Sequence, residues 1–146
     1  MKRNLAGLVF LAGVLLPGCK NKGTQLATRM VAVGENKCIV QLLPAGFQEG
    51  NDNDNGSFDY YRVIIESKAR MTDSSHIHAI NFGMEQAIHK VIDDDTLLPV
   101  FVQRIANGKK ENYEYIVSFE RTAEPKQYEI LINDPVFEMG PLSLKF

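Results

Sequence analysis

Short runs in which apolar and polar residues alternate limit, more than any other feature, what this chain of 146 residues can fold into. The clearest run is Phe58–Glu66, where Tyr61, Val63 and Ile65 occupy every second position. A period of two places successive side chains on opposite faces of a strand, and β-branched and aromatic residues favour strands. We therefore predict a strand that turns one face, that of Tyr61, toward a core.

Six further stretches have this strand-like composition. They are Arg29–Val33, Lys37–Leu43, Leu97–Ile105, Tyr113–Glu120, Tyr128–Ile132 and Leu142–Phe146. Gly34, Glu35 and Asn36 predict a hairpin turn between the first two. Because Pro99 lacks the N–H that a ladder needs, its end of the third strand is expected at an edge or a bulge. Tyr113–Glu120 is expected to be half-buried, with one largely polar face.

The stretch 71–92 is compatible with two structures. Helical spacing is shown by Met84, Ala87, Ile88, Val91 and Ile92, whereas one strand face would hold Phe82, Met84, Gln86, Ile88 and Ile92. The acids that follow, Asp93 to Asp95, would oppose the dipole of a helix that ended there but suit a hairpin loop. We predict a strand over Ile80–Ile92, preceded by a short helix or turn around Thr72–His76.

The amino terminus has the character of an export signal. Lys2 and Arg3 precede an apolar run, Leu5–Leu16, that is too short to span a bilayer comfortably. The sequence that closes it, Leu16-Pro17-Gly18-Cys19, resembles the lipobox of bacterial lipoproteins. This resemblance implies that Cys19 is acylated, with palmitate among the expected chains, and becomes the first residue of the mature protein. An uncleaved amino-terminal anchor helix is the alternative.

These features predict a signal peptide over residues 1–18, a lipidated flexible tether over 19–28 and one domain over 29–146. About seven or eight short strands and no internal repeat favour an all-β, antiparallel β-sandwich with at most one short helix. By the lipoprotein resemblance, the absence of acids before Glu35 implies the outer membrane, facing the periplasm or the cell surface. Loss of Lys2 and Arg3 leaves 14 basic against 18 acidic side chains, 14 − 18 = −4, which argues against nucleic-acid partners.

Cys38 is the only thiol left once Cys19 carries lipid. Its neighbours Ile39 and Val40 suggest burial, so we expect an inert core cysteine. An intermolecular disulfide or a reactive thiol is the alternative in an oxidising compartment.

Two stretches contain possible metal ligands. The stretch Asn51 to Gly56 resembles a calcium loop, but Arg62 falls where an EF-hand needs a bidentate glutamate, so we expect a solvated loop; an irregular calcium site formed by Asp52, Asp54 and Asp59 is the alternative. His76 and His78 would share a face if extended, with Asp73 or His89 as a third ligand. We expect neither stretch to hold a metal.

Catalytic patterns are weak throughout. Ser74 and Ser75 lack the Gly-x-Ser-x-Gly turn of a nucleophilic serine, and adjacent acids such as Asp93 and Asp94 stay solvated in a turn. No Gly-rich phosphate loop and no Cys-x-x-Cys pair occurs. We therefore predict a protein that is not an enzyme and needs no cofactor beyond the covalent lipid.

A candidate partner surface is formed by Tyr60, Arg62 and Ile64 on the outer face of the strand 58–66. Exposed tyrosine beside arginine is typical of interface hot spots. The alternative is that Tyr60 packs against a second layer or the acidic loop.

Two functions follow. The first is a membrane-anchored, noncatalytic interaction module that docks a partner protein and assembles an envelope complex. In size, lipobox and strand content it resembles the small outer-membrane lipoproteins of type VI secretion machines, although no family-specific motif is matched. The alternative is an envelope lipoprotein that binds a small ligand or a metal through His76 and His78.

Overall fold

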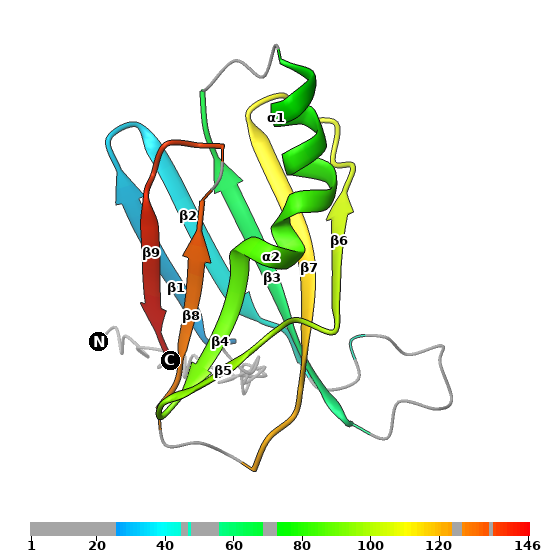
Figure 1. The fold of residues 1–146 in the computed structure, drawn as a ribbon, viewed down its shortest axis with the longest axis vertical. Coiled ribbons are helices and arrows are strands. Elements are labelled where there is room, and N and C mark those ends of the chain that lie inside the picture. The colour runs from blue at the N-terminus through cyan, green and yellow to red at the C-terminus, as the bar shows by residue number, and fades with distance from the viewer. Residues whose placement is uncertain (1–25, 45–46, 48–55, 69–72, 124–126, 135) are drawn as a thin grey trace, which may run out of the picture.

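The computed structural model describes residues 26–44, 47, 56–68, 73–123, 127–134 and 136–146, which form two antiparallel sheets packed face to face (Figure 1). The five-stranded sheet has the order β1 (Thr28–Val33), β2 (Asn36–Leu42), β3 (Phe58–Glu66), β7 (Asn112–Glu120) and β6 (Phe101–Ile105). The four-stranded sheet has the order β5 (Asp95–Leu97), β4 (Ile88–Ile92), β8 (Glu129–Asn133) and β9 (Pro141–Lys145). The predicted antiparallel β-sandwich is confirmed.

The core lies between the sheets and follows from the alternation in β3 and β7. Tyr61, Val63 and Ile65 of β3 are at most 1% exposed, as their period-two spacing predicts. The neighbouring strand contributes Tyr115 and Phe119, which are equally buried. Each such side chain stabilises the fold by about 1.5–3 kcal/mol through the apolar area it removes from water.

The predicted hairpin between the first two strands is confirmed. Val33 pairs with Asn36, which leaves Gly34 and Glu35 in the turn. Gly34 has a φ of 60°, a conformation that glycine adopts without a steric penalty.

The prediction of one strand over Leu97–Ile105 is wrong. The chain leaves the four-stranded sheet after β5 and joins the other sheet as β6, so that Pro99 lies in the crossover between them. Because proline has no N–H to donate, it interrupts the strand pairing, and the residues before and after Pro99 belong to different strands. This split raises the number of strands in the described residues to nine.

The prediction of a strand over Ile80–Ile92 is wrong in its first half. A helical segment fills it, composed of α1 (Ser74–His78), the π-helical turn η1 (Ala79–Gly83) and α2 (Met84–Ala87), and β4 begins at Ile88. The strand prediction placed Phe82 and Met84 on one face, yet they are 68% and 1% exposed. The expected short helix or turn near Thr72–His76 is found as α1, two residues later.

Tertiary packing selects the helix over the strand. Ile80, Met84 and Ala87, at helical spacing, are buried against the sheets, and the hydroxyl of Tyr115 donates to the carbonyl of Ile80 at 3.0 Å. The acids from Asp93 follow a strand rather than a helix, so the helix dipole does not act on them. They form the predicted hairpin turn, because Ile92 pairs with Asp95.

The expectation that the strand Tyr113–Glu120 is half-buried is also wrong, because its largely polar face is buried as well. Glu114, Ile116 and Ser118 on that face are at most 9% exposed. The strand lies between β3 and β6, so neighbouring side chains flank this row on both sides. Sequence alternation gives the phase of a strand but does not show how many neighbours it has.

One end of the sandwich holds both ends of the described domain. β1 begins and β9 ends at this end, where the Arg29 Nε donates to the carbonyl of Lys145 at 2.6 Å (Figure 1). The β4–β5 hairpin turns at the same end, and the helical segment lies toward the opposite one (Figure 1). Among the described residues no helix has the length and hydropathy needed to cross a bilayer.

Candidate interaction surface

The predicted surface residues lie on the outer face of the five-stranded sheet. Arg62 and Ile64 point away from the core, opposite in phase to Val63. Strand pairing extends the position of Ile64 into a row that crosses the whole sheet. The row consists of Met30, Ile39, Ile64, Glu114 and Ile105.

Four of these five residues are apolar, which is unusual for the solvent-facing side of a sandwich. Met30 is 64% exposed, and Ile39, Ile64 and Ile105 are partly exposed. A fifth apolar residue, Ile116, pairs with Arg62 in the adjoining row, and a sixth, Phe101 at the sheet edge, pairs with Ser118. We call the six residues Met30, Ile39, Ile64, Ile105, Ile116 and Phe101 the outer apolar band.

An ion pair lies within this band. The Arg62 Nε donates to the Glu114 Oε1 at 2.6 Å, and Asn107 donates to the other carboxylate oxygen at 3.4 Å. The hydrogen bond from Arg62 holds the pKa of Glu114 below its usual value, and the same bond raises the pKa of Arg62. Arg62 and Glu114 therefore stay charged and neutralise each other. The other residues of this region are the apolar side chains of the band.

Tyr60 does not have the exposure expected of it. It lies on the outer face, but it is only 8% exposed, and the ring of Phe47 lies 6.2 Å from its own between centroids. Phe47 is 44% exposed, so the accessible aromatic side chain at this position is Phe47 rather than Tyr60. The alternative, that Tyr60 packs against a second layer or the acidic loop, agrees with its low exposure, although the contact described is with Phe47 and positions 51–55 lie outside the described residues.

The histidine pair is not assembled into a metal site in the described residues. His76 and His78 lie on α1, where residues two apart point to different sides, and the His78 ring contacts Phe82 instead. Asp73 caps α1 by accepting from the Ser75 N–H at 3.1 Å and the Ser75 Oγ at 2.6 Å, which lowers its pKa. His89 lies on β4. No group of three or more potential ligands occurs in the part of the chain described here.

Three other sequence predictions have separate outcomes. Cys38 is fully buried, and burial together with Asp134 raises its thiol pKa to about 12, as an inert core cysteine requires. The acidic positions 51–55 and the lipidation candidate Cys19 lie outside the described residues. Asp59, a possible calcium ligand in the sequence, instead forms ion pairs with Lys90 and Arg121.

Sequence reasoning missed a buried lysine. Lys90 on β4 is 1% exposed and points into the core, where its Nζ lies 2.9 Å from the Asp59 Oδ2 of the opposite sheet. The ammonium also lies 4.7 Å from the ring centroid of Tyr128, a cation–π contact. Arg121 binds the second Asp59 oxygen at 2.9 Å. The signal was present in the sequence, because position 90 shares a strand face with Ile88 and position 59 shares one with Tyr61.

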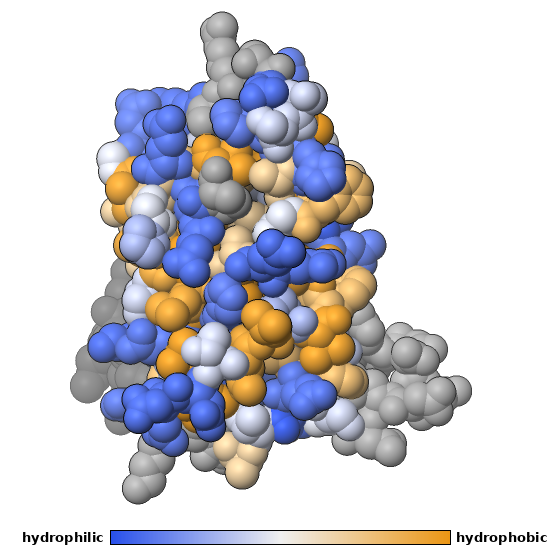
Figure 2. Space-filling view, viewed as in Figure 1, coloured by the Kyte–Doolittle hydropathy of each residue, from blue (hydrophilic) through white to orange (hydrophobic). Residues whose placement is uncertain are grey.

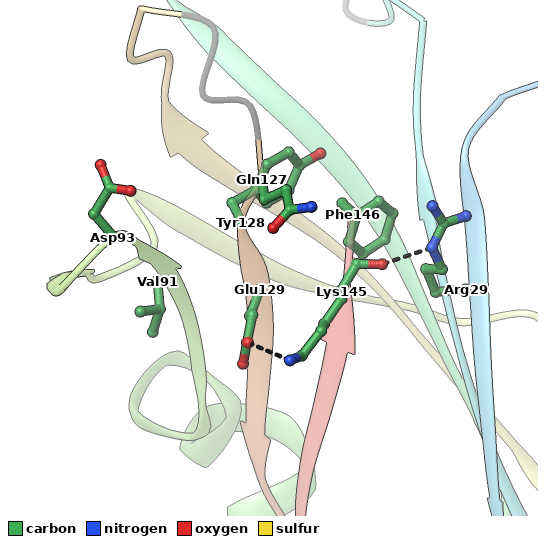
Figure 3. A pocket seen from close by; sticks show the side chains of 8 residues that line it. All are labelled: Arg29, Val91, Asp93, Gln127, Tyr128, Glu129, Lys145 and Phe146. Atoms are coloured by element: carbon green, nitrogen blue, oxygen red, sulfur yellow. Dashed lines mark hydrogen bonds and ion pairs between the residues drawn. The ribbon is translucent and has the colours of Figure 1, made fainter.

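A half-open pocket of about 440 Å³ lies on the four-stranded sheet at the end where β1 begins (Figure 3). Asp93 and Val91 of the β4 side lie on one wall, and Arg29, Lys145 and Phe146 lie on the other (Figure 3). Its lining is completed by Gln127, Tyr128 and Glu129.

Figure 2, in the orientation of Figure 1, shows hydrophilic side chains scattered among apolar ones over the visible face of the molecule.

Comparison with family models, with curated proteins and with solved structures finds no match for this chain.

Proposed function

We propose that this protein is a membrane-anchored, noncatalytic interaction module. Lipid on Cys19 holds the β-sandwich at the outer membrane, and the outer apolar band docks a protein of the envelope, such as a component of a secretion apparatus. The observation that carries this proposal is the row from Met30 to Ile105, which presents apolar side chains on a sheet face that usually faces water.

The charged side chains that lie among the residues of the outer apolar band indicate the chemistry of the partner. Arg62 and Glu114 neutralise each other at 2.6 Å, and Lys37 and Glu66 at the rim do the same at 2.7 Å. Since no net charge remains in these pairs, the complementary surface is expected to be apolar at its centre and hydrogen-bonding at its margin. An apolar centre inside a polar rim is the usual anatomy of a protein–protein interface.

Site-specific photocrosslinking in the bacterial envelope tests this docking face. A photoreactive residue placed at Met30 or Ile105 should yield the same crosslinked partner from opposite edges of the five-stranded sheet. The matched control positions, Thr96 and Ser143, lie on the outer face of the other sheet and should yield none. Equal crosslinking from both sheets, or none from the outer apolar band, would refute the docking proposal.

The lipid anchor has its own test. The Cys19→Ala chain should leave the membrane fraction but keep the thermal unfolding midpoint of the unacylated wild-type domain, because Cys19 precedes the first described strand, β1, in the sequence. One acyl chain alone holds only marginally, whereas two or more anchor stably. A Cys19→Ala protein that still sediments with membranes after a salt wash would contradict lipidation at this residue.

A further inference from the structure

The turn that joins β6 to β7 contains an asparagine directly followed by a glycine. Asn107 is partly buried, and Gly108 is exposed with a φ of 72°. Apart from its chain neighbours, no heavy atom of the described residues lies within 4 Å of the place where a Cβ of Gly108 would stand. Glycine has no side chain to shield its backbone nitrogen. The nitrogen of Gly108 is therefore open to solvent and to the side chain of Asn107.

A hydrogen bond holds the Asn107 amide over this nitrogen. The Asn107 Oδ1 accepts from the Lys109 N–H at 3.0 Å. The ring that this bond closes contains both the Asn107 Cγ and the Gly108 nitrogen, so the two atoms are held close together. The same bond polarises the side-chain carbonyl and stabilises negative charge on its oxygen.

The Gly108 nitrogen is not engaged elsewhere in the part of the chain that the structure describes. Its N–H donates to no acceptor there. No hydrogen bond between described residues therefore has to break before this nitrogen can react. The turn thus places an activated carbonyl carbon beside an available nucleophile, which is the arrangement that an intramolecular attack needs.

We propose that Asn107 modifies itself, through a cyclic imide with Gly108, to aspartate or isoaspartate. The Gly108 nitrogen forms a bond to the Asn107 Cγ and gives its proton to water. The Cγ–Nδ2 bond breaks, and the nitrogen takes a proton from water and leaves as ammonia. Water then adds to one of the two imide carbonyls and breaks its bond to the shared nitrogen. Water is the only co-reactant, and no atom is oxidised or reduced.

The new carboxylate would lie at the margin of the outer apolar band. The Asn107 Nδ2 that is lost lies 2.8 Å from the Asn112 Oδ1 and 3.4 Å from the Glu114 Oε2. Arg62 already binds the other oxygen of Glu114 at 2.6 Å. A second carboxylate beside Glu114 would be repelled by it, because like charges at this separation interact strongly near a protein surface. The modification therefore adds a negative charge at the margin of the band.

This charge gives the modification a consequence for docking, which rests on the proposed function of the outer apolar band. Glu114 lies in the same row as Ile64 and Ile105, and it is neutralised by Arg62 in the unmodified protein. A partner whose surface is apolar would have to desolvate the added carboxylate without a counter-charge. Conversion of Asn107 should therefore weaken docking as the protein ages.

Mass spectrometry of the full chain with Cys19→Ala, which lacks the anchoring residue, tests the modification. After incubation in mildly alkaline buffer, brief cleavage at Arg104 and Lys109 releases the fragment Ile105–Lys109, in which Asn107 is the only side-chain amide. Conversion replaces NH₂ by OH in this fragment and separates it into aspartyl and isoaspartyl forms. The folded chain should convert at least as fast as a synthetic peptide of the same sequence, because the turn holds the reacting atoms together.

Two variants distinguish this chemistry from general loss of amides. Gly108→Asp keeps a residue that tolerates a positive φ but adds a side chain beside the attacking nitrogen, so conversion should slow at least about tenfold. Asn107→Gln enlarges the ring that must form and should slow it as much. The second Asn–Gly pair of the chain, Asn55–Gly56, is released in a different fragment. Slower conversion in the folded chain than in the peptide, or conversion that Gly108→Asp leaves unchanged, would overturn the proposal.

Photocrosslinking from Met30 tests the consequence for docking. Asn107→Asp carries the new charge permanently and should reduce the crosslinked fraction at least about threefold, whereas Asn107→Gln should leave it unchanged. Equal crosslinking by both variants would overturn the effect on docking. Absence of crosslinks from the parent chain would refute the docking function instead, and the mass of the fragment Ile105–Lys109 would still decide whether Asn107 is modified.

Discussion

Two cation–carboxylate pairs occupy opposite environments in this sandwich. Arg62 and Glu114 meet on the outer face of the five-stranded sheet, with the arginine side chain 41% exposed. Lys90 and Asp59 meet between the sheets, with the lysine side chain 1% exposed. The two pairs have nearly equal lengths, 2.6 and 2.9 Å, so their environments must decide what each contributes.

The difference shows what charge does inside and outside a sandwich. A buried ammonium must be compensated, so Lys90 needs Asp59, and their contact joins the two sheets. Arg62 is 41% exposed, so water screens its pair with Glu114, which contributes less to stability than a fully buried pair. The surface pair instead neutralises its own charges among apolar neighbours, which is the environment that a docking partner would meet.

The largest expected effect comes from separating the buried pair. Asp59→Ala leaves the Lys90 ammonium uncompensated and should lower the free energy of unfolding by about 3 kcal/mol. Equilibrium urea unfolding of the unacylated domain measures it. Lys90→Met, which removes the charge and keeps an unbranched side chain, should cost clearly less, and combining it with Asp59→Ala should recover part of the loss. Equal losses in both single variants would mean that Lys90 is not a desolvated charge.

An intermediate effect should distinguish the outer faces of the two sheets. Ile64→Lys puts a charge in the middle of the outer apolar band and should weaken partner binding by about 2 kcal/mol, roughly thirtyfold, because central residues dominate interfaces. Leu131→Lys makes the same change at a partly exposed position of the four-stranded sheet and should leave binding unchanged. Quantitative crosslinking from Met30 at graded expression provides the measurement. Weakening by both variants would remove the distinction between the faces.

The smallest effect should come from the surface pair. Glu114→Gln is expected to lower stability at neutral pH by no more than about 1 kcal/mol, since Arg62 is well exposed. The pKa of Glu114 is lower in the folded state than its ordinary value of 4.5, so its contribution is present above that pH. As the pH falls through the folded-state pKa this contribution is lost, and the difference between the two proteins should close. Thermal unfolding from pH 7 to pH 3 tests it, and a constant difference would contradict the assignment.

Local patterns predicted the strands well where the alternation was complete. The strand Phe58–Glu66 was predicted at its observed bounds, because Tyr61, Val63 and Ile65 place an apolar residue at every second position. The strand over Ile80–Ile92 was wrong up to Ala87, because Met84, Ile88 and Ile92 satisfy both periods and only contact with the sheets selects the helical one. Leu97–Ile105 was wrong because a single apolar stretch does not reveal that its two halves belong to different sheets.

The candidate site was predicted in the same partial way. Arg62 and Ile64 were assigned to the correct face of their strand, since a phase of two is a local property. The exposure of Tyr60 was predicted wrongly, because its ring contacts Phe47, which lies thirteen positions earlier in the sequence. Met30 and Ile105 were not associated with Ile64, because strand order is set by long-range pairing that no short window contains.

The sequence by itself determined the class of fold, the phase of the main strands and the hairpin at Gly34, because each depends on residues close together in the chain. Only the tertiary structure decided where the charges lie. It brought Asp59 and Lys90 together across the core and placed Arg62 beside Glu114 on the surface. It also placed Arg29 and Asp93 on opposite walls of one pocket. These residues lie far apart in sequence, so they come together only when the strands have paired and the sheets have packed.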